Sequence, residues 1–501
     1  MTRDLWSDAR SSKVLLALGL FLVLVGARAA LIAHAGSQTP FMDEWDGDWN
    51  GLIRPYLRGD LTLDMLTQPF MEHRILFTRL TTLSIFNVSG YWDVLLQMIA
   101  NAIIGSAGIV AAAFMLARVL SGRYALIAIV SVSLINVVPF SYDSILLGFN
   151  THFYLLPIFS LLGLWLIAGG EAWSRRWLTG VAVGAASFFC LASGALTLSA
   201  AIVVVVLQMA CGRRSGWREW LGVAVFAATV GVMISFVPHV AESDAHRARS
   251  LGEFLTALAR FAGWPGGHIV GLLLPLPSVV FLLRVFADRP ERTDARWFNV
   301  AALAWAAAQI TSLAFGRGQD PVQSRYIDIL MIGLTVHFVS ALWIIQTRAL
   351  GEGRRTAAIA LATWVAIIGV TLPHAERHLA KSIAGWRDTI DAGGENVRLY
   401  LATGDAEYLS GHGAYTIPYP YSDRLRLFLD SPEAVHGLPP ELLSHTPPHN
   451  RIEAFKRRFL RFGPIWIGLG LLMLPVALIR PRKSPLGLEA AIAHAERRVS
   501  G

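Results

Sequence analysis

Long apolar stretches, separated by short polar and basic segments, run through the chain from one end to the other. About 20 apolar residues are enough to cross the hydrocarbon core of a bilayer as a helix. The pattern predicts twelve spans, at residues 14–34, 92–117, 124–138, 152–169, 177–192, 195–211, 220–238, 266–286, 298–315, 327–346, 356–373 and 463–480. Only Ser193-Gly194 separates the fifth span from the sixth, so this pair marks either a tight turn or a re-entrant break.

Lysine and arginine residues are concentrated in alternate connecting segments, which fall on one side of the membrane if there are twelve spans. Short loops rich in Lys and Arg stay in the cytoplasm. We therefore expect both termini to be cytoplasmic and segments 35–90 and 374–462 to be outside. Ala33-His34-Ala35 resembles a signal-peptide cleavage site, but the preceding apolar stretch exceeds the usual length of about 7–15 residues, so we expect a retained first helix.

Composition agrees with this pattern and narrows the class of protein. The chain of 501 residues is 54% hydrophobic and 16% charged, whereas a soluble protein has about 25% charged residues. We expect an all-α polytopic membrane protein, because the apolar stretches lack the alternation of an outer-membrane barrel. The net charge of +8 is spread over short loops, which argues against nucleic-acid binding. Cys190 and Cys211 lie in apolar stretches, without the spacing of a zinc site or disulfide framework.

An acidic cluster, Asp43-Glu44-Trp45-Asp46-Gly47-Asp48, follows the first apolar stretch. Carboxylates at a membrane boundary cost free energy unless they are solvated or paired, so a cluster there indicates function. Gly59-Asp60, Pro69 and Glu72-His73-Arg74 come next, before the chain re-enters the membrane. This order resembles the membrane glycosyltransferases of the C-type fold (GT-C), which use polyprenyl-phosphate sugars. The resemblance covers about 45 residues closely, and Glu72-His73-Arg74 stands where many relatives have a Lys-Pro-Pro segment.

The resemblance implies a GT-C-like division of the chain. Residues 1–373 would form the transmembrane catalytic module, with 35–90 as its first outer loop. Residues 374–462 would form a small extracytoplasmic domain or loop, since Pro418-Tyr419-Pro420-Tyr421 and nearby apolar residues suggest a folded unit. Residues 463–501 would form the last transmembrane helix and a cytoplasmic tail.

The resemblance also implies roles for individual residues. Asp43 would be the catalytic base and Glu44 its helper, because glycosyl transfer requires a carboxylate that deprotonates the acceptor hydroxyl. The other reading of Asp43 is a cap on an interfacial helix. Arginine suits the leaving phosphate, because its planar fork binds two phosphate oxygens. The candidate phosphate-binding residues are Arg317, Arg325, Tyr326, His73 and Arg74. The two loop arginines could instead reach lipid headgroups.

A second group of residues is predicted to line the substrate pocket, and a divalent metal ion could bind nearby. The pocket candidates are Trp45, Asp46, Glu72, Tyr142, Asp143, Asn150 and His152. Those between Phe140 and Phe153 could instead belong to an interfacial aromatic belt. A divalent cation, Mg or Mn, could bind the carboxylates of the acidic cluster, although its ligands are not specified by the sequence.

The predicted function is that of an inverting hexosyl- or pentosyltransferase in a bacterial cytoplasmic (inner) membrane. It would move a sugar from a polyprenyl-phosphate donor to a cell-envelope glycan, lipid or protein acceptor, in an active site that faces outside. One alternative is a transporter or flippase of lipid-linked glycans, which would require ionisable residues inside several spans. Another is an outer-face glycan ligase or polymerase, which differs mainly in its donor.

Overall fold

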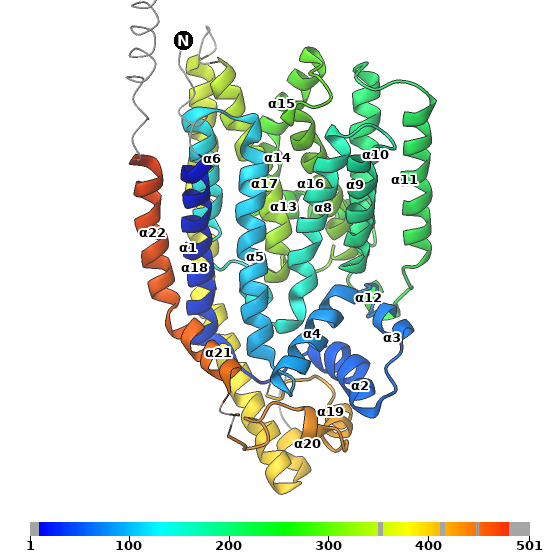
Figure 1. Cartoon of the computed structure of the whole chain (residues 1–501), viewed down its shortest axis with the longest axis vertical. Coiled ribbons are helices and arrows are strands. Elements are labelled where there is room, and N and C mark those ends of the chain that lie inside the picture. Colours follow the sequence, from blue (N-terminus) through cyan, green and yellow to red (C-terminus); the bar gives the residue numbers. More distant parts are fainter. Residues whose placement is uncertain (1–9, 349–353, 411–415, 447, 449, 480–501) are drawn as a thin grey trace, which may run out of the picture.

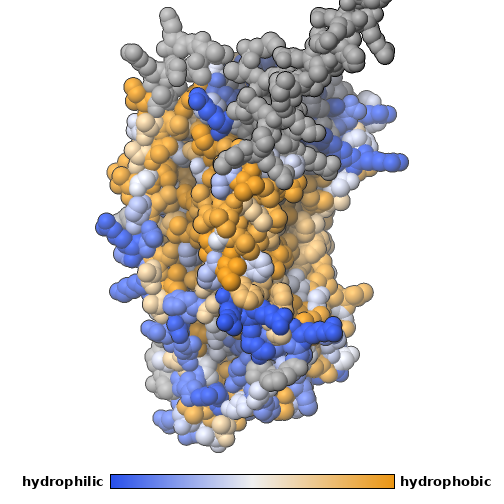
Figure 2. All heavy atoms as spheres, turned by 60° about the vertical axis from the view of Figure 1, so that its left-hand side comes forward, coloured by the Kyte–Doolittle hydropathy of each residue, from blue (hydrophilic) through white to orange (hydrophobic). Residues whose placement is uncertain are grey.

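A computed structural model describes residues 10–348, 354–410, 416–446, 448 and 450–479 of the chain. The described residues are helical and contain no β-strand. Long helices lie side by side along the long axis, with short helices gathered at one end (Figure 1). Hydrophobic residues cover the middle of the face in Figure 2, and hydrophilic residues gather at the lower end. The expected α-helical membrane protein is confirmed at this level.

Eight candidate spans within the described residues are long and apolar enough to cross a membrane. They are formed by α1 (Arg10–Ala35), α5 (Val94–Leu116), α8 (Thr151–Gly169), α10 (Ala195–Ala210), α11 (Trp217–Ser235), α15 (Leu276–Asp288), α16 (Ala295–Gly316) and α17 (Ile327–Arg348). The span of α15 begins with α14 (His268–Leu273). Counting the bent pair α21 (Arg451–Arg461) and α22 (Gly463–Ile479) as one span gives nine.

The other three predicted spans are helical but do not meet the same criteria. Residues 124–138 lie mostly in α6 (Gly122–Ile135), and 177–192 begin in α9 (Arg175–Ala186). Residues 356–373 form the first part of α18 (Arg354–Thr403). The count of twelve spans therefore stays a prediction. The remaining α-helices are α2 (Arg54–Arg58), α3 (Leu63–Thr67), α4 (Leu76–Ser89), α7 (Tyr142–Leu146), α12 (Ala241–Asp244), α13 (Leu251–Ala262), α19 (Ser422–Leu429) and α20 (Ala434–Gly437).

Seven shorter helical segments are of other types. The first, η1 (Trp45–Ile53), is a π-helix. The 3₁₀ segments are η2 (Ala117–Val119), η3 (Gly148–Asn150), η4 (Ser187–Phe189), η5 (Ala192–Gly194), η6 (Ser324–Tyr326) and η7 (Ala406–Leu409). The Ser193-Gly194 pair thus lies in a 3₁₀ turn between α9 and α10, and Gly194 is buried.

The first and last described helices, α1 and α22, pack closely along their length. A Cβ atom added to Gly26 would lie 2.6 Å from the carbonyl oxygen of Gly463, and one added to Gly470 would lie 2.5 Å from that of Gly19. Glycines at a helix crossing let two backbones approach, which favours association inside a membrane. The end of the described chain therefore returns along its first span.

The 50-residue helix α18 continues across the boundary expected between residues 373 and 374. The segment after α18 then packs against the first loop. Trp45 lies with its ring parallel to that of Phe428, with 6.4 Å between the ring centroids. Trp92 lies 5.5 Å from Trp45 and 5.7 Å from Trp49 by the same measure. Residues 416–443 therefore share one hydrophobic core with segment 35–90. The expected tail at 480–501 lies outside the described residues.

Candidate functional site

Among the acidic residues of the cluster, Glu44 and Asp48 are buried, Asp46 is partly exposed, and the most accessible to solvent is Asp43. Protein nevertheless surrounds it, and this burial raises the pKa of its carboxyl, while Arg325 and Arg317 oppose the shift and Asp46 adds to it. Met42, just before it, has a positive φ of 50°. A non-glycine residue in this conformation costs about 1–3 kcal/mol and often marks a functional site. The N–H of Met42 donates to the carbonyl of Pro418 at 2.8 Å, which helps to hold this conformation.

Glu44, the next residue, is fully enclosed. Its two carboxyl oxygens accept hydrogen bonds from the backbone N–H groups of Phe41 at 2.7 Å and Phe149 at 3.2 Å. Burial and the nearby Asp48 raise the pKa of Glu44 to about 8, although these N–H groups oppose the shift. Glu44 therefore ties the first loop to the start of α8, and Asp43 is the better placed of the two to accept a proton from a bound molecule.

The rest of the acidic cluster winds into the π-helix η1. π-Helical turns are rare and occur frequently at functional sites. Trp45 is buried, and its Nε1 donates to the carbonyl of Pro40 at 2.9 Å. Asp46 accepts a hydrogen bond from the hydroxyl of Tyr419 at 2.7 Å and forms an ion pair with Arg424 at 2.5 Å. These two predicted pocket residues therefore join η1 to its surroundings.

Asp48 belongs to a buried polar chain that the sequence did not reveal. Its Oδ1 accepts a hydrogen bond from the hydroxyl of Thr82 at 2.9 Å, and Gln97 donates to the same hydroxyl at 2.9 Å. Its Oδ2 is buried, and the nearby side chain of Trp92 favours the charged form of the carboxyl. Burial raises the pKa of Asp48 to about 7, against the hydrogen bond from Thr82 and the charge of Arg79.

Two arginines contact Tyr326: Arg317, at the end of α16, and Arg325, in η6 just before α17. The Nε of Arg317 donates to the hydroxyl of Tyr326 at 3.1 Å. The guanidinium of Arg325 lies 5.5 Å from the centroid of the same ring. The Nε of Arg325 is buried and has no hydrogen-bond partner within the described residues. Tyr326 therefore organises two cations, one of which keeps an unused donor.

Asp143 brings a second carboxylate to these cations. Its backbone N–H donates to the hydroxyl of Ser324 at 3.1 Å, which joins α7 to η6. Burial raises the pKa of Asp143, the charge of Arg325 opposes this, and Asp43 adds to it. Asp43, Asp143 and Arg325 thus interact electrostatically, although they come from three separate loops.

His73 and Glu72 reach this charged group from a tight turn. Backbone hydrogen bonds of 2.7 and 2.9 Å join Phe70 to His73, and Met71 between them has a positive φ of 51°. The backbone N–H of Ala192 donates to Nδ1 of His73 at 3.4 Å. Burial lowers the pKa of His73 to about 4; Glu72 opposes the shift, while Arg317 and Arg325 add to it. His73 is therefore neutral near pH 7, with its hydrogen on Nε2.

The remaining phosphate-binding candidate, Arg74, contacts residues outside this charged group. Arg74 donates to the carbonyls of Thr67 and Phe236 and lies over the ring of Phe236. This places its guanidinium in contacts other than those of Arg317 and Tyr326.

Three pocket candidates come from α7 and the start of α8. Tyr142 packs its ring 6.2 Å from that of Trp386 in α18. Asn150 donates to the carbonyl of Asp143 at 3.4 Å. His152 is buried, and its Nδ1 shares a hydrogen bond of 3.0 Å with the hydroxyl of Thr78. These contacts stabilise the loop that holds Asp143.

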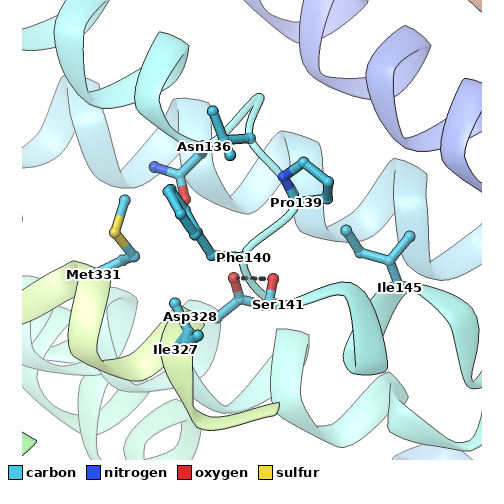
Figure 3. Close-up of a pocket in the computed structure, with 9 residues that line it drawn as sticks. Asn136, Pro139, Phe140, Ser141, Ile145, Ile327, Asp328 and Met331 are labelled. Atoms are coloured by element: carbon cyan, nitrogen blue, oxygen red, sulfur yellow. Dashed lines mark hydrogen bonds between the residues drawn. The ribbon is translucent and has the colours of Figure 1, made fainter. Parts of the chain in front are cut away.

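A small pocket lies beside this loop, between residues 136–145 and the start of α17 (Figure 3). Ser141 donates to Oδ1 of Asp328 at 2.8 Å in this pocket. The space is suited to a water molecule and is too small for a sugar ring. Arg28 of α1 interacts electrostatically with Asp328, and its Nε and Nη1 are buried without a hydrogen-bond partner among the described residues. Sequence analysis did not single out either charge.

The described residues contain no group of three or more His, Cys, Asp or Glu side chains that could hold a metal ion. In the acidic cluster, Glu44 and Asp46 are engaged with protein groups. The divalent cation suggested by the sequence therefore stays a prediction without assigned ligands.

No protein-family model, curated protein or solved structure matches the chain. The chemistry of the site thus has to be argued from its own residues. An accessible carboxylate with a raised pKa, two arginines and a neutral histidine interact at one end of the helical bundle. Such a group can take a proton from one bound molecule and hold an anion of another.

Proposed function

We propose that this chain is an inverting glycosyltransferase that moves a sugar from a polyprenyl-phosphate donor to a cell-envelope acceptor at the outer face of the cytoplasmic membrane. The observation that carries the proposal is an accessible Asp43 beside Arg317 and Arg325, which both contact Tyr326 and oppose the raised pKa of Asp43. These residues are about 280 positions apart in the chain. A base and a phosphate-binding group are the two functions that this reaction requires.

The reaction balances with these residues alone. The Asp43 carboxylate takes the proton of the acceptor hydroxyl as its oxygen forms a bond to the anomeric carbon of the sugar. The bond between that carbon and the phosphate oxygen breaks, and the phosphate leaves with the electron pair. Arg325 and Arg317 stabilise the negative charge that develops on the phosphate. Nε2–H of neutral His73 can donate to an oxygen of the donor. One displacement inverts the anomeric configuration.

Several features support an accessible base and a preorganised anion site. Asp43 reaches solvent, whereas Glu44 is enclosed by backbone N–H groups. A raised pKa makes a carboxylate a stronger base, provided that it is ionised at the working pH. The buried Nε of Arg325 offers a donor that the described protein does not use. Groups fixed in advance stabilise a developing charge without having to reorganise during the reaction.

The direct test is Asp43→Asn in the purified full-length protein, with a polyprenyl-phosphate sugar and a crude cell-envelope acceptor fraction. The amide keeps the shape of the side chain but cannot accept the proton. We expect turnover to fall by roughly 10²–10⁴-fold. Asp64→Asn is the matched control, because Asp64 is exposed on the same loop and is not one of the residues that carry the resemblance. Turnover of the Asp43 variant close to wild type would exclude Asp43 as the base.

A transporter or flippase of lipid-linked glycans is the second candidate. It is favoured by Arg28 and Asp328, which are ionisable residues inside α1 and α17. Such residues often mark a substrate pathway in a membrane protein. The sequence alone suggested that the spans contain almost none. Proteoliposomes with a fluorescent lipid-linked sugar distinguish the two: a transporter moves the lipid between leaflets, whereas a transferase releases polyprenyl phosphate. A glycan ligase or polymerase would instead require a lipid-linked oligosaccharide as donor.

A further inference from the structure

Helix α21 carries an exposed basic and aromatic face. Its sequence is RIEAFKRRFLR, and Arg451, Arg457, Arg458 and Arg461 are all exposed. Phe455 and the following Phe462 are 44% and 37% exposed. None of the four arginines forms an ion pair or a side-chain hydrogen bond with another residue in the part of the chain that the structure describes. Arginine beside exposed phenylalanine is typical of helices that lie in a membrane interface.

The opposite face of α21 is fixed to the protein by a buried polar cluster. Nζ of Lys456 lies 2.7 Å from Oδ2 of Asp93 and 2.6 Å from Oε1 of Glu453. The hydroxyl of Tyr91 donates to Glu453 at 2.5 Å and accepts from Lys456 at 2.7 Å. This arrangement uses the one lysine and the one glutamate of the helix internally. The outer face is left with positive charge only.

The position of α21 brings this face to the edge of the apolar region. The helix is bent by 58° against α22, which is strongly apolar. In Figure 1, α21 lies obliquely at the lower end of α22, on the side that Figure 2 turns forward. Hydrophilic residues in Figure 2 begin directly below the apolar region. Phenylalanine side chains can enter the acyl region there, while the arginines reach the level of the phosphates.

We propose that the exposed face of α21 binds the phosphate groups of anionic phospholipids in the leaflet on the side of Asp43. Membrane phosphates complement four arginines without protein partners, and arginine binds phosphate through paired hydrogen bonds. The expected topology puts α21 outside, where basic residues are disfavoured, so the positive-inside bias does not account for them. A zwitterionic headgroup offers no net charge. The surface therefore fits an anionic lipid, and the proposal does not depend on the glycosyltransferase activity.

The test compares lipid retention by the purified full-length protein, using native mass spectrometry after addition of equal amounts of phosphatidylglycerol and phosphatidylcholine. We expect wild type to retain phosphatidylglycerol preferentially. The variant R457Q/R458Q/R461Q should lose this preference by about tenfold or more, because each basic residue near a charged membrane surface contributes separately. R457K/R458K/R461K should keep part of the preference, since it keeps the charge and loses the paired geometry.

The matched control is R387Q/R398Q/R426Q, which removes the same charge from exposed arginines that have acidic partners, Asp391, Glu395 and Asp430. Its preference should equal that of wild type. Equal preference in wild type and R457Q/R458Q/R461Q, or equal loss in the control, would overturn the proposal. If the glutamine variant does not fold, a wild-type preference that is insensitive to added salt would overturn it as well. Loss of polyprenyl-phosphate binding alone would assign the surface to the donor instead.

Discussion

Two neighbouring carboxylates, Asp43 and Glu44, differ more in their surroundings than in their chemistry. Asp43 reaches solvent and interacts with Arg325, whereas Glu44 accepts two backbone hydrogen bonds inside the protein. The sequence paired them as a base and its helper. In the structure, Glu44 holds the loop and Asp43 stays accessible to solvent. The difference follows from burial. Two acidic residues that are adjacent in the sequence do not reveal which of them will be buried.

At Arg325, charge and geometry can be separated by two substitutions. We expect Arg325→Ala to weaken binding of a polyprenyl-phosphate sugar more than Arg325→Lys does. Lysine keeps attraction to phosphate as a point charge but loses the two-pronged contact of the guanidinium, which lies over the ring of Tyr326. Donor affinity in detergent, with thermal stability as the control, measures the effect. Equal affinity of both variants and wild type would show that Arg325 does not hold the donor.

Asp48 gives the fold a pH dependence of predictable sign. Its folded-state pKa of about 7 lies above the ordinary value of 3.8, so the folded state keeps a proton that the unfolded state has already released. The contribution of Asp48 to the free energy of unfolding is therefore fully present below the ordinary pKa. It is lost as the pH rises towards about 7.

Asp48→Asn should remove this loss, because the neutral amide can keep the hydrogen bond from Thr82. We therefore expect the difference in thermal midpoint between the variant and wild type to favour the variant more at alkaline pH than at acidic pH. Unfolding scans in detergent at several pH values measure the difference. A difference between the two proteins that is independent of pH would contradict the predicted shift.

At the scale of elements, the site depends on contacts between segments distant in the chain. The π-helix η1 is joined to residues 418–424 by the hydrogen bond from Tyr419 and the ion pair from Arg424 to Asp46. The strained Met42 is held by Pro418 from the same segment. The late segment therefore helps to orient Asp43.

Tyr419→Phe tests this role. The variant loses the hydrogen bond to Asp46, which typically contributes about 1 kcal/mol. We expect turnover to fall several-fold with little change in donor affinity, because Arg325 and Arg317 are not touched. Tyr421→Phe is the matched control, since Tyr421 is 63% exposed. Equal turnover of both variants would show that the late segment does not position Asp43.

At the scale of the whole molecule, the first loop and several later connections between helices meet at one end. His73 contacts Ala192, Arg74 contacts Phe236, and Asp143 contacts Ser324. These contacts bring connections that are distant in the chain to one end of the bundle, and the alternation expected from the Lys/Arg distribution stays a prediction.

Cysteine labelling in intact cells tests the orientation. We expect Asp60→Cys to react with a membrane-impermeant reagent in spheroplasts, and Glu171→Cys to react only after lysis. Both positions are exposed; Asp60 lies in the first loop, whereas Glu171 forms an ion pair of 3.1 Å with Arg292. Cys190 and Cys211 are buried, so the native background should be low. The reverse labelling pattern would invert the orientation and move the proposed site to the cytoplasm.

The sequence by itself determined the helical membrane class, because apolar runs long enough to span a bilayer leave few other structures possible. It also pointed to Asp43, Arg317 and Arg325 as candidates, and the structure lets these three interact. It could not separate Glu44 from Asp43, or show that Asp46 binds Tyr419, because those outcomes depend on which distant segment packs beside the loop. Only tertiary packing decides burial and neighbours, and these set the charge, accessibility and orientation of each side chain.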